Sequence, residues 1–465
     1  MNIAVNEPQS TTIEKEVNIK VCDAIMGSGK TSAAINYMNA HPRERFIYVS
    51  PRLSEDTRIM NACPALRFEL PVEDKKRGRK KTGDLKRLLY NRRNVAISHR
   101  LFSLCDDEIG EIVRQNGYIL IIDEVVNVLF EAKTNMSNLR IIERTGALRR
   151  YDDGRVEISG DIEADMRKSA FSDLVIHAAS HRLVSDSKEN LLFWMVSDRM
   201  LRACKQVIIM TYMFERSPMC AYLKMHHLSY EPLYVAHPAD GEYYFSDHMS
   251  YMPEYTGRVS QLIHVCDNPK LNAIGEVRTH LSHNWYHEQK RLYERHMEQK
   301  RANGANAKKK REEMDPFRRV RANMYSFFEY RNDANLKHDC LWACYSDMQD
   351  GMTRNGYKTN FLVFNATSMN NFGDRHYLAY PVNVYQKISI RRYFKEHEID
   401  IEDNDYALSC MIQWIWRSAI RNGEEVWLYL PSSRMRRLLN QWMKRVEQDY
   451  AQYQESLLKE DVSNG

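Results

Sequence analysis

The chain has 465 residues, of which 43% are hydrophobic and 28% are charged. This composition is ordinary for a globular protein and excludes disordered and collagen-like chains, and at about 150 residues per domain the length predicts two or three domains. The net charge of +5 is a mild excess of basic residues. No uncharged apolar run approaches the roughly 18 residues that a membrane span needs, so we expect a protein that is neither secreted nor membrane-embedded.

The nine cysteines are odd in number, and no two of them have the C-x-x-C spacing of a zinc knuckle or a redox site. We therefore expect reduced, mostly buried thiols in a cytoplasmic protein. Cys340 and Cys344, with His338 nearby, come nearest to a metal cluster, but a second ligand pair is missing. The sequence therefore predicts no metal cage.

Short apolar runs rich in β-branched residues alternate with helical patterns from residue 17 to about residue 214. Each run has the length of a strand, and the segments between the runs are long enough for crossover helices. This alternation is typical of a parallel sheet with helices on both faces. The expected strands are VNIKVCDA (17–24), RFIYVSP (45–51), NVAISH (94–99), YILIIDEV (118–125) and QVIIMTY (206–212).

A second, less regular region contains the strand-like runs NFLVFNAT (360–367), YLAYPVN (377–383) and EVWLYLP (425–431), which indicate a second α/β domain. The Pro- and Tyr-rich stretch between the two regions has little periodicity and suits a connector. We expect an N-terminal extension, a first domain, a connector, a second domain and a tail that frays at its end. Their ranges are 1–16, 17–225, 226–255, 256–450 and 451–465.

Two segments concentrate positive charge. The first has six basic residues among the seven positions 75–81, and because few acids balance them, phosphate contact is favoured over a solvated face. The second, an insertion at about 284–321 within the second domain, mixes basic residues with acids, and both interpretations remain open there. The basic residues of the first segment are Lys75, Lys76, Arg77, Arg79, Lys80 and Lys81.

A glycine-rich stretch follows the first expected strand and leads into a helical pattern, which is the context of a Walker A loop. Glycines let backbone N–H groups approach phosphate oxygens, and the start of a helix adds positive potential. Lys30 would reach the β- and γ-phosphates, and Thr31 would offer its hydroxyl to Mg²⁺. With this flanking structure a nucleotide site is favoured over an ordinary turn. The expected ATP-binding residues are Ala24, Met26, Gly27, Ser28, Gly29, Lys30 and Thr31.

Two acidic residues, Asp123 and Glu124, end the fourth expected strand. A nucleotide site needs a carboxylate for Mg²⁺ and a group that orients the attacking water. We expect Asp123, with Thr31, to hold the ion and Glu124 to be the base. The alternative is an acid pair that caps the next helix, and the upstream Lys30 argues against it.

The late segment 413–421 offers positive charge to the γ-phosphate, which raises the rate of such sites by about 10³ to 10⁵. Arg417 and Arg421 stand four positions apart, so a helix would place both on one face, with Gln413 a further turn before them. An amphipathic helix with arginines on its wet side is an equally open interpretation of this segment alone.

Together these motifs resemble those of superfamily 2 helicases of the DEAD/DExH-box type. Residues 24–31 look like motif I, residues 123–126 like motif II, residues 49–53 like motif Ia and residues 413–421 like motif VI. Thr211 is similar to the first residue of the S-A-T element that couples hydrolysis to movement. Two departures stand out, because Trp416 replaces the usual Gly of motif VI and Tyr212 replaces the small Ala of the S-A-T element.

The resemblance implies an α/β fold of two RecA-like P-loop NTPase domains with parallel sheets and with ATP and Mg²⁺ in the cleft between them. It implies that Lys30, Asp123 and Glu124 come from the first domain, and Gln413, Arg417 and Arg421 from the second. It also implies a nucleic-acid strand that crosses both domains. Its expected contacts are Pro51, Arg52, Ser98, His99 and Thr367, together with the basic run at 75–81.

The motifs look closest to those of phage and viral replication helicases, including the origin-binding group. The first hypothesis is therefore a DNA-stimulated ATPase that moves along or unwinds DNA in replication or recombination. An initiator that uses ATP as a switch at an origin or junction is the alternative, and a packaging motor ranks last because no set of nuclease carboxylates follows. We expect single-stranded or forked DNA and other replication proteins as partners, no membrane, and the host cytoplasm as the location of a phage-encoded protein.

Overall fold

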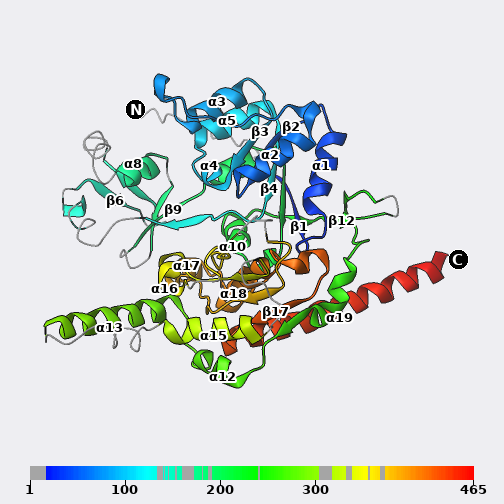
Figure 1. Ribbon diagram of the computed structural model, residues 1–465. Helices are drawn as coiled ribbons and strands as arrows, with labels where there is room; N and C mark the ends of the chain where they lie inside the picture. Colours follow the sequence, from blue (N-terminus) through cyan, green and yellow to red (C-terminus); the bar gives the residue numbers. More distant parts are fainter. Residues whose placement is uncertain are drawn as a thin grey trace, which may run out of the picture.

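The computed structural model describes residues 17–132, 140, 142–144, 146–151, 154–159, 172–180, 182–186, 191–238, 241–302, 317–330, 338–353, 357–366 and 372–464. These residues form two α/β domains, one above the other in Figure 1, each built around a parallel sheet. The predicted fold class is thereby confirmed. In the part of the chain that is described, no helix is long and apolar enough to cross a membrane.

The first sheet has the strand order β11-β1-β10-β4-β2-β3, and all its strands are parallel. All five strands predicted for this region are confirmed. Because the strands are parallel, their carboxyl ends meet at one edge, where ligands bind in open α/β sheets. The strands are β1 (Asn18–Asp23), β2 (Arg45–Ser50), β3 (Val95–Ser98), β4 (Tyr118–Asp123), β10 (Gln206–Thr211) and β11 (Glu231–Pro232).

Helices cover both faces of this sheet, and the central strand β4 is buried along its whole length. Ile119 and Ile121 of β4 join a cluster with residues of α1 and α2, whereas Leu120 and Ile122 join residues of α3, α5 and α10 on the other face. Alternate side chains of one strand thus supply two cores. The helices are α1 (Lys30–Ala40), α2 (Leu53–Ala62), α3 (Lys81–Tyr90), α4 (His99–Ser103), α5 (Asp107–Asn116), α9 (Asp198–Arg202) and α10 (Pro218–Met225).

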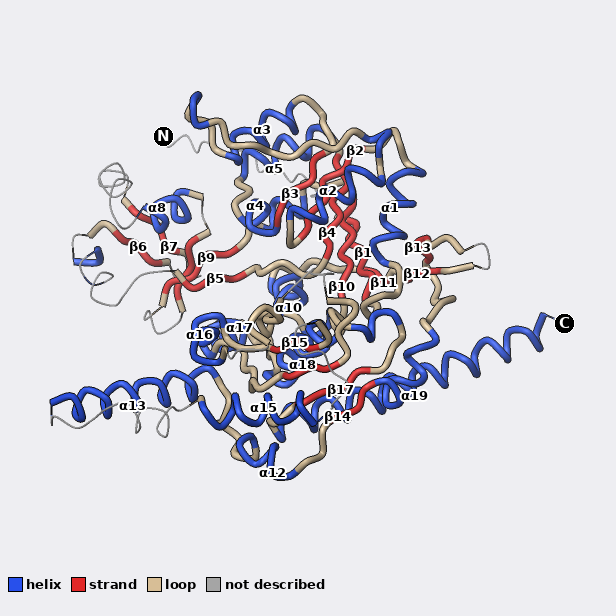
Figure 2. Tube along the Cα trace, in the orientation of Figure 1, coloured by secondary structure: helices blue, strands red, loops and turns tan. Residues whose placement is uncertain are grey.

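A small module that the sequence did not predict lies between β4 and β10, at the left of Figure 2. It reaches the second domain, because Lys387 lies 3.4 Å from Glu131 and Arg392 pairs with Asp186. Helix α17 (Ile388–Glu396) of the second domain also packs apolar residues against the first domain's core. The module contains β5 (Leu129–Glu131), β6 (Leu148–Arg150), β7 (Val156–Ile158), α8 (Ser172–Ala179), β8 (Leu183–Ser185) and β9 (Leu192–Met195).

The expected connector at 226–255 is more ordered than the sequence indicated. Its residues Glu231 and Pro232 form β11, which pairs with β1, so the first sheet extends beyond the boundary placed at residue 225. The next residues form an antiparallel hairpin of β12 (Tyr234–Ala236) and β13 (Tyr244–Ser246). Strand β13 packs against α1, which brings the Tyr-rich segment close to the glycine-rich loop.

The second sheet is parallel, with the order β14-β17-β16-β15. Two of the three predicted strands are confirmed, but the prediction for 360–367 was wrong, since this run makes only a single bridge from Phe361 to Trp342. Two strands of three residues were missed because so short a run has no visible periodicity. The strands are β14 (Ile263–Val265), β15 (Cys340–Trp342), β16 (Tyr377–Ala379) and β17 (Val426–Tyr429).

Helices surround the second sheet, and two of them project from the molecule (Figure 1). The first residues of the basic insertion form helix α13. Residues 303–316 of the insertion lie outside the described part of the chain. Helix α19 continues to Asn464, so 451–464 is helical rather than a separate tail. The helices are α11 (Val259–Leu262), α12 (Pro269–Asn272), α13 (His283–Ala302), α15 (Arg318–Tyr330), α16 (Gln349–Met352), α18 (Asp403–Ile415) and α19 (Ser433–Asn464).

All nine cysteines are unpaired, and seven of them are buried, as the sequence predicted. Cys340 and Cys344 both lie in the core of the second domain. The amide of Asn360 donates to the sulfur of Cys340 at 3.3 Å. Cys340 and Cys344 therefore have a packing role. Burial raises the pKa of the Cys344 thiol to about 12.

Candidate nucleotide site

The glycine-rich loop joins the end of β1 to the start of α1. Gly27 and Gly29 have φ values of 83° and 86°, in the left-handed region that glycine adopts without strain. Gly29 is the N-cap of α1, so the free N–H groups of the first helical turn face the cleft. The hydroxyl of Ser28 is buried and has no hydrogen-bond partner among the described residues. An unsatisfied buried hydroxyl at a helix N-terminus fits a loop that binds an anion.

Lys30 folds back onto the loop. Its ammonium donates to the carbonyl of Ile25 at 2.9 Å and also to the carbonyl of Ala24. Burial lowers the pKa of Lys30, while nearby acids, including Asp123, act against that shift. The side-chain nitrogen is therefore held by backbone carbonyl oxygens in the region that the sequence assigned to phosphates.

The side chain of Asp123 ends β4 inside the cleft. Its Oδ2 atom accepts a hydrogen bond of 2.8 Å from the hydroxyl of Tyr48, a residue of β2 that the sequence analysis did not identify. Burial, together with the neighbouring Glu124, raises the pKa of Asp123 to about 6. Strand pairing explains the missed contact, because Tyr48 and Asp123 lie near the same carboxyl edge of adjacent strands.

Glu124 links the two domains. Its Oε1 atom accepts a hydrogen bond of 2.9 Å from the guanidinium of Arg417, whose side chain is 6% exposed. The backbone of Glu124 has φ 63°, and its N–H donates to the carbonyl of Met210 at 2.8 Å. A left-handed backbone in a residue other than glycine is costly and is typical of positions where function fixes the geometry.

The prediction that one helix carries both Arg417 and Arg421 on the same face was wrong. Helix α18 ends at Ile415, and Arg421 lies in a separate 3₁₀ turn (Ala419–Asn422). The extended backbone of Ser418 (φ −98°, ψ −169°) interrupts the helix. Both arginines nevertheless reach the cleft, and the Arg421 carbonyl lies 3.9 Å from the position that a Cβ on Gly27 would take.

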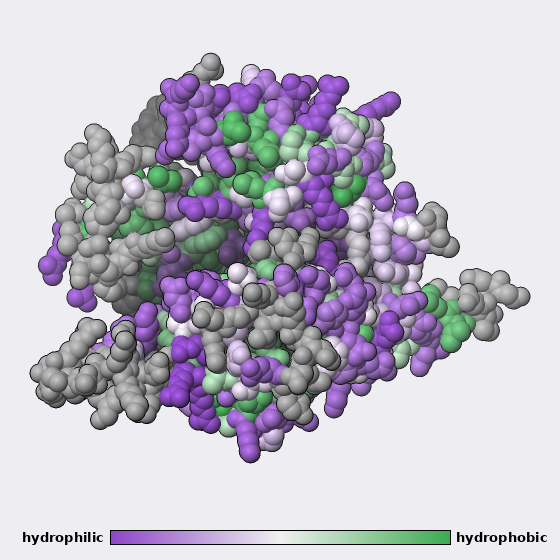
Figure 3. Space-filling model, viewed as in Figure 1, coloured by the Kyte–Doolittle hydropathy of each residue, from purple (hydrophilic) through white to green (hydrophobic). Residues whose placement is uncertain are grey.

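A cleft of about 310 Å³ between the domains brings most of the predicted residues together, although Ala24 and Ser28 line a neighbouring cavity instead. Figure 3 shows that the surface of this face is hollowed between the two domains. Gln413 lines it as well, with its amide donating to Ser409 at 3.1 Å. The predicted residues along the cleft are Met26, Gly27, Gly29, Lys30, Thr31, Asp123, Glu124, Thr211, Gln413, Arg417 and Arg421. Further lining residues include Glu55, Arg58, Tyr212, Tyr243, Trp416 and Asn422.

Two tyrosines after β12 cover the loop and were missed by the sequence analysis. The ring of Tyr243 lies 2.1 Å from the position of a Cβ on Gly29, so any side chain there would clash. Asn36 holds Tyr243 by donating to its carbonyl at 2.8 Å. The hydroxyl of Tyr255 donates to the carbonyl of Met26. The only signal in the sequence was the high tyrosine content of the connector.

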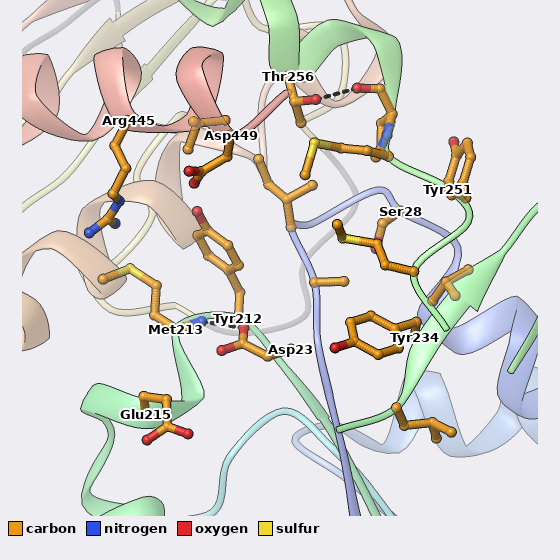
Figure 4. A pocket seen from close by; sticks show the side chains of 18 of the residues that line it. Asp23, Ser28, Tyr212, Met213, Glu215, Tyr234, Tyr251, Thr256, Arg445 and Asp449 are labelled. Carbon is orange, nitrogen blue, oxygen red and sulfur yellow. Dashed lines mark hydrogen bonds between the residues drawn. The ribbon is translucent and has the colours of Figure 1, made fainter. Parts of the chain in front are cut away.

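A second cavity of about 350 Å³ lies beside the loop (Figure 4). Asp23, at its base, accepts backbone N–H bonds from Met213 at 2.7 Å and from Phe214 at 2.8 Å. Burial raises the pKa of Asp23. The remaining lining combines Ala24 and Ser28 of the loop with aromatic and apolar residues and with α19. Such a mainly apolar cavity with a few polar groups is typical of a ligand pocket.

The residues predicted to contact nucleic acid from the first domain lie near the nucleotide site. His99 contacts the carbonyl of Asp123 at 2.8 Å, and burial lowers the pKa of its imidazole. Ser98 caps α4 by accepting from the N–H of Leu101 at 3.3 Å. Arg52 and Pro51 are half-buried. Nucleic-acid contact at these four positions stays a prediction.

The predicted basic run forms a 3₁₀ turn (Lys75–Arg77) and the start of α3. Arg79 differs from the lysines of the run, because its guanidinium lies 3.4 Å from Asp84 and 3.7 Å from Asp74 and so has a structural role. The side chain of Arg77 and the whole of Thr367 lie outside the described residues. Four lysines of the run are exposed, namely Lys75, Lys76, Lys80 and Lys81.

Comparison with known proteins finds a relative that derives from a prophage. Residues 257–443 match a family model described as the YonV C-terminal Rossmann-like domain. The SPbeta prophage-derived uncharacterized protein YonV of Bacillus subtilis (strain 168) is 28% identical over 432 residues, which cover 92% of this chain and 98% of that protein. The chain is therefore similar to a prophage protein over nearly its whole length.

Solved structures with similar chains include S. tokodaii Xpd4, at 12% identity and a TM-score of 0.43, and an XPD helicase, at 11% identity and a TM-score of 0.41. The first match covers 92% of this chain and 94% of the other, and the second covers 91% and 95%.

Proposed function

We propose that this protein is an ATP-dependent DNA helicase or translocase of superfamily 2. The observation that carries the proposal is the cleft in which Lys30, Asp123 and Glu124 of one domain face Arg417 of the other. A site that receives an arginine across a domain cleft can link hydrolysis to the relative position of its domains. The prophage relative fits a role in phage DNA replication or recombination in the host cytoplasm.

The residues of the loop fit ATP and Mg²⁺. The N–H groups of the first turn of α1 and the unsatisfied hydroxyl of Ser28 would bind phosphate oxygens. Lys30 would exchange its backbone carbonyls for phosphate, while Thr31 and Asp123 would hold the ion. Bound Mg²⁺ would neutralise charge on the phosphates. Glu124 would orient the attacking water.

The arginines would complete this site from the second domain. Arg417 pairs with Glu124 at 2.9 Å, so it lies beside the residue assigned to the water. Arg421 lines the same cleft, with its backbone carbonyl close to Gly27 of the loop. Burial, with the nearby Arg417, lowers the pKa of its guanidinium. Two mutually repelling arginines in one cleft favour the binding of a polyanion between them.

The base of the nucleotide would lie among the tyrosines that follow β12. Tyr243 covers Gly29 and lines the cleft, and its ring lies within 6.0 Å of the ring of Tyr251 in the adjoining cavity. Aromatic rings beside a phosphate loop offer stacking surfaces to a purine. Coupling through Thr211 and binding of DNA along the exposed lysines of the basic run belong to the same proposal.

Steady-state ATP hydrolysis tests the proposal. Rates are measured without nucleic acid and then with single-stranded DNA, duplex DNA, forked DNA and RNA. Lys30→Ala serves as the blank, and Lys205→Ala is the matched control, because Lys205 is 55% exposed and pairs with Glu44 away from the cleft. We expect stimulation by DNA that Lys30→Ala abolishes and Lys205→Ala retains. ATP binding without stimulated turnover would instead indicate an ATP-switched initiator.

DNA binding by the basic run is tested separately through salt dependence. Each phosphate that a protein neutralises contributes about −0.9 to the slope of log K against log salt for duplex DNA. Replacing Lys75, Lys76, Lys80 and Lys81 by alanine should flatten that slope. Since Arg79 is held by acids, it is left unchanged. An unaltered slope would contradict the role of the run.

A further inference from the structure

Three side chains that the nucleotide site does not use meet at the base of α13. His283 and His287 stand one helical turn apart in the first turns of α13, and Asp347 belongs to a 3₁₀ turn (Ser346–Met348) that follows β15. The Oδ2 atom of Asp347 lies 3.1 Å from Nε2 of His283 and 2.7 Å from Nε2 of His287. The two Nε2 atoms are 3.1 Å apart.

Hydrogen bonds alone cannot satisfy this triangle. Each imidazole carries at most one proton on Nε2, and an ionised carboxylate carries none. If both imidazoles donate to Asp347, two donors face each other at 3.1 Å. If one imidazole donates to the other, the accepting nitrogen opposes the carboxylate with a lone pair. With Asp347 ionised, one of the three contacts is therefore unfavourable whichever imidazole nitrogens carry protons.

We propose that His283, His287 and Asp347 bind a divalent transition-metal ion of the Zn²⁺ class. In a zinc site each ligand atom lies about 2.0–2.1 Å from the ion. For ligand–metal–ligand angles of about 90–110°, two ligand atoms are then about 2.9–3.4 Å apart. The observed 2.7, 3.1 and 3.1 Å agree with that range to within a few tenths of an ångström. Because both nitrogens would then act as acceptors, the ion turns all three contacts into favourable ones.

The chemistry of the three ligands selects the ion. Imidazole nitrogen suits Zn²⁺ and neighbouring transition metals, whereas Mg²⁺ and Ca²⁺ prefer oxygen ligands throughout. Two histidines four residues apart on a helix present both nitrogens on one side, and a carboxylate from another element completes a three-ligand set. All three side chains are between 46% and 49% exposed, so further positions on the ion are open to water or to a fourth ligand.

The position of the cluster indicates what the ion does. Asp347 is fixed close to the second sheet, because Met348 of the same turn is buried. Next to it, Tyr345 packs edge-on against His283 at 4.9 Å and donates from its hydroxyl to the carbonyl of Asn383 at 3.0 Å. An ion bound here would tie the first turns of α13 to the segment after β15, and so would set the direction in which this projecting helix leaves the domain.

The test uses the full chain after dialysis against a chelator, with Co²⁺ as the spectroscopic probe and Zn²⁺ as the competitor. We compare His287→Ala and Asp347→Asn with the wild type. His264→Ala is the matched control, because His264 pairs with Glu425 at 2.6 Å and no third ligand joins them among the residues that the structure describes. Ions bound at cysteines or at the nucleotide site contribute equally to all four proteins.

We expect the wild type and His264→Ala to bind one more equivalent of Co²⁺ than the two variants, with Zn²⁺ displacing it. Removal of a ligand should weaken this binding at least about tenfold, since even loss of an outer-shell partner costs about 10–100-fold. Circular dichroism confirms that the half-exposed variants are folded. Equal stoichiometry and affinity in all four proteins would overturn the proposal, as would a wild type whose bound Co²⁺ shows no histidine ligation.

Discussion

Asp56, in the first turn of α2, is a buried acid whose ionisation should control the stability of the first domain. Its side chain is fully buried, and its Oδ1 atom accepts from the hydroxyl of Ser50 at 2.7 Å. Its Oδ2 atom has no hydrogen-bond partner in the part of the chain that the structure describes. Burial raises the pKa of this carboxyl from 3.8 to about 6. A shift of about two pKa units corresponds to roughly 3 kcal/mol of unfolding free energy.

The sign follows from the raised pKa. Below about pH 4 the carboxyl is protonated in both states, so its full contribution to stability is present. As the pH rises through about 6, the unfolded chain has already ionised and the folded chain resists ionisation, so that contribution is lost. We expect Asp56→Asn to be about 1 kcal/mol less stable than the wild type near pH 4, because the new amide protons lack partners. At pH 7, where the wild type carries the ionisation penalty of roughly 3 kcal/mol, the variant should be more stable by about 2 kcal/mol.

Thermal unfolding measured between pH 4.5 and 8 tests this expectation. For a domain of about 200 residues the gain corresponds to about 4–8 °C in Tm at pH 7. Ser50→Ala is the matched variant, because the Ser50 hydroxyl lowers the pKa of Asp56, so its loss should steepen the pH dependence. A constant difference between Asp56→Asn and the wild type at all pH values would refute the reasoning.

Three further predictions concern the cleft. Tyr48→Phe removes the hydrogen bond that lowers the pKa of Asp123, so the Mg²⁺ requirement of the ATPase should rise severalfold at pH 6.5 and less at pH 8; an effect independent of pH would contradict this. Arg417→Ala or Arg421→Ala should lower kcat by about 10³ with ATP affinity largely kept, and two silent variants would refute the arginine assignment. Tyr243→Ala should raise KM for ATP without changing DNA affinity, and an unchanged KM would exclude the tyrosine as a base contact.

The elements that could be predicted from the sequence are those marked by an apolar run of several residues or by a local glycine pattern. β4 has an uninterrupted apolar run that ends in Asp123 and Glu124, and this run fixed both a central strand and two site residues. The glycine-rich loop was equally readable, because Gly27 and Gly29 meet a local backbone requirement. Strands of three residues, such as β15, carry no periodicity, and pairing with neighbours far along the chain defines them instead.

The unpredicted part of the site depends on tertiary contacts. Tyr48 reaches Asp123 only because β2 and β4 pair. Tyr243 covers Gly29 only because the hairpin after β11 folds onto α1. The helix expected over residues 413–421 failed for another reason, since Ser418 takes an extended backbone that no helical periodicity reveals. Residue types indicated the chemistry, whereas contacts between distant segments determined the geometry.

The two departures from the helicase motifs meet at one residue of α19, Trp442. Its indole N–H donates to the hydroxyl of Tyr212 at 2.7 Å, and its ring packs edge-on against Trp416 with centroids 5.5 Å apart. The ring centroid of Trp416 in turn lies 6.1 Å from that of Tyr255, whose hydroxyl donates to the carbonyl of Met26 in the glycine-rich loop. Where the resemblance places two small residues, this chain has two large rings joined by a third.

This arrangement gives a physical reason for both substitutions. Trp416 is only 1% exposed, and it packs against Trp442, which in turn bonds to Tyr212, so the large rings are accommodated together. The aromatic chain connects the phosphate loop, the segment after β10, the arginine segment and α19. A shift of one domain against the other would break the hydrogen bond between Trp442 and Tyr212. If the proposed function is correct, these contacts would connect the nucleotide site to the position of the second domain.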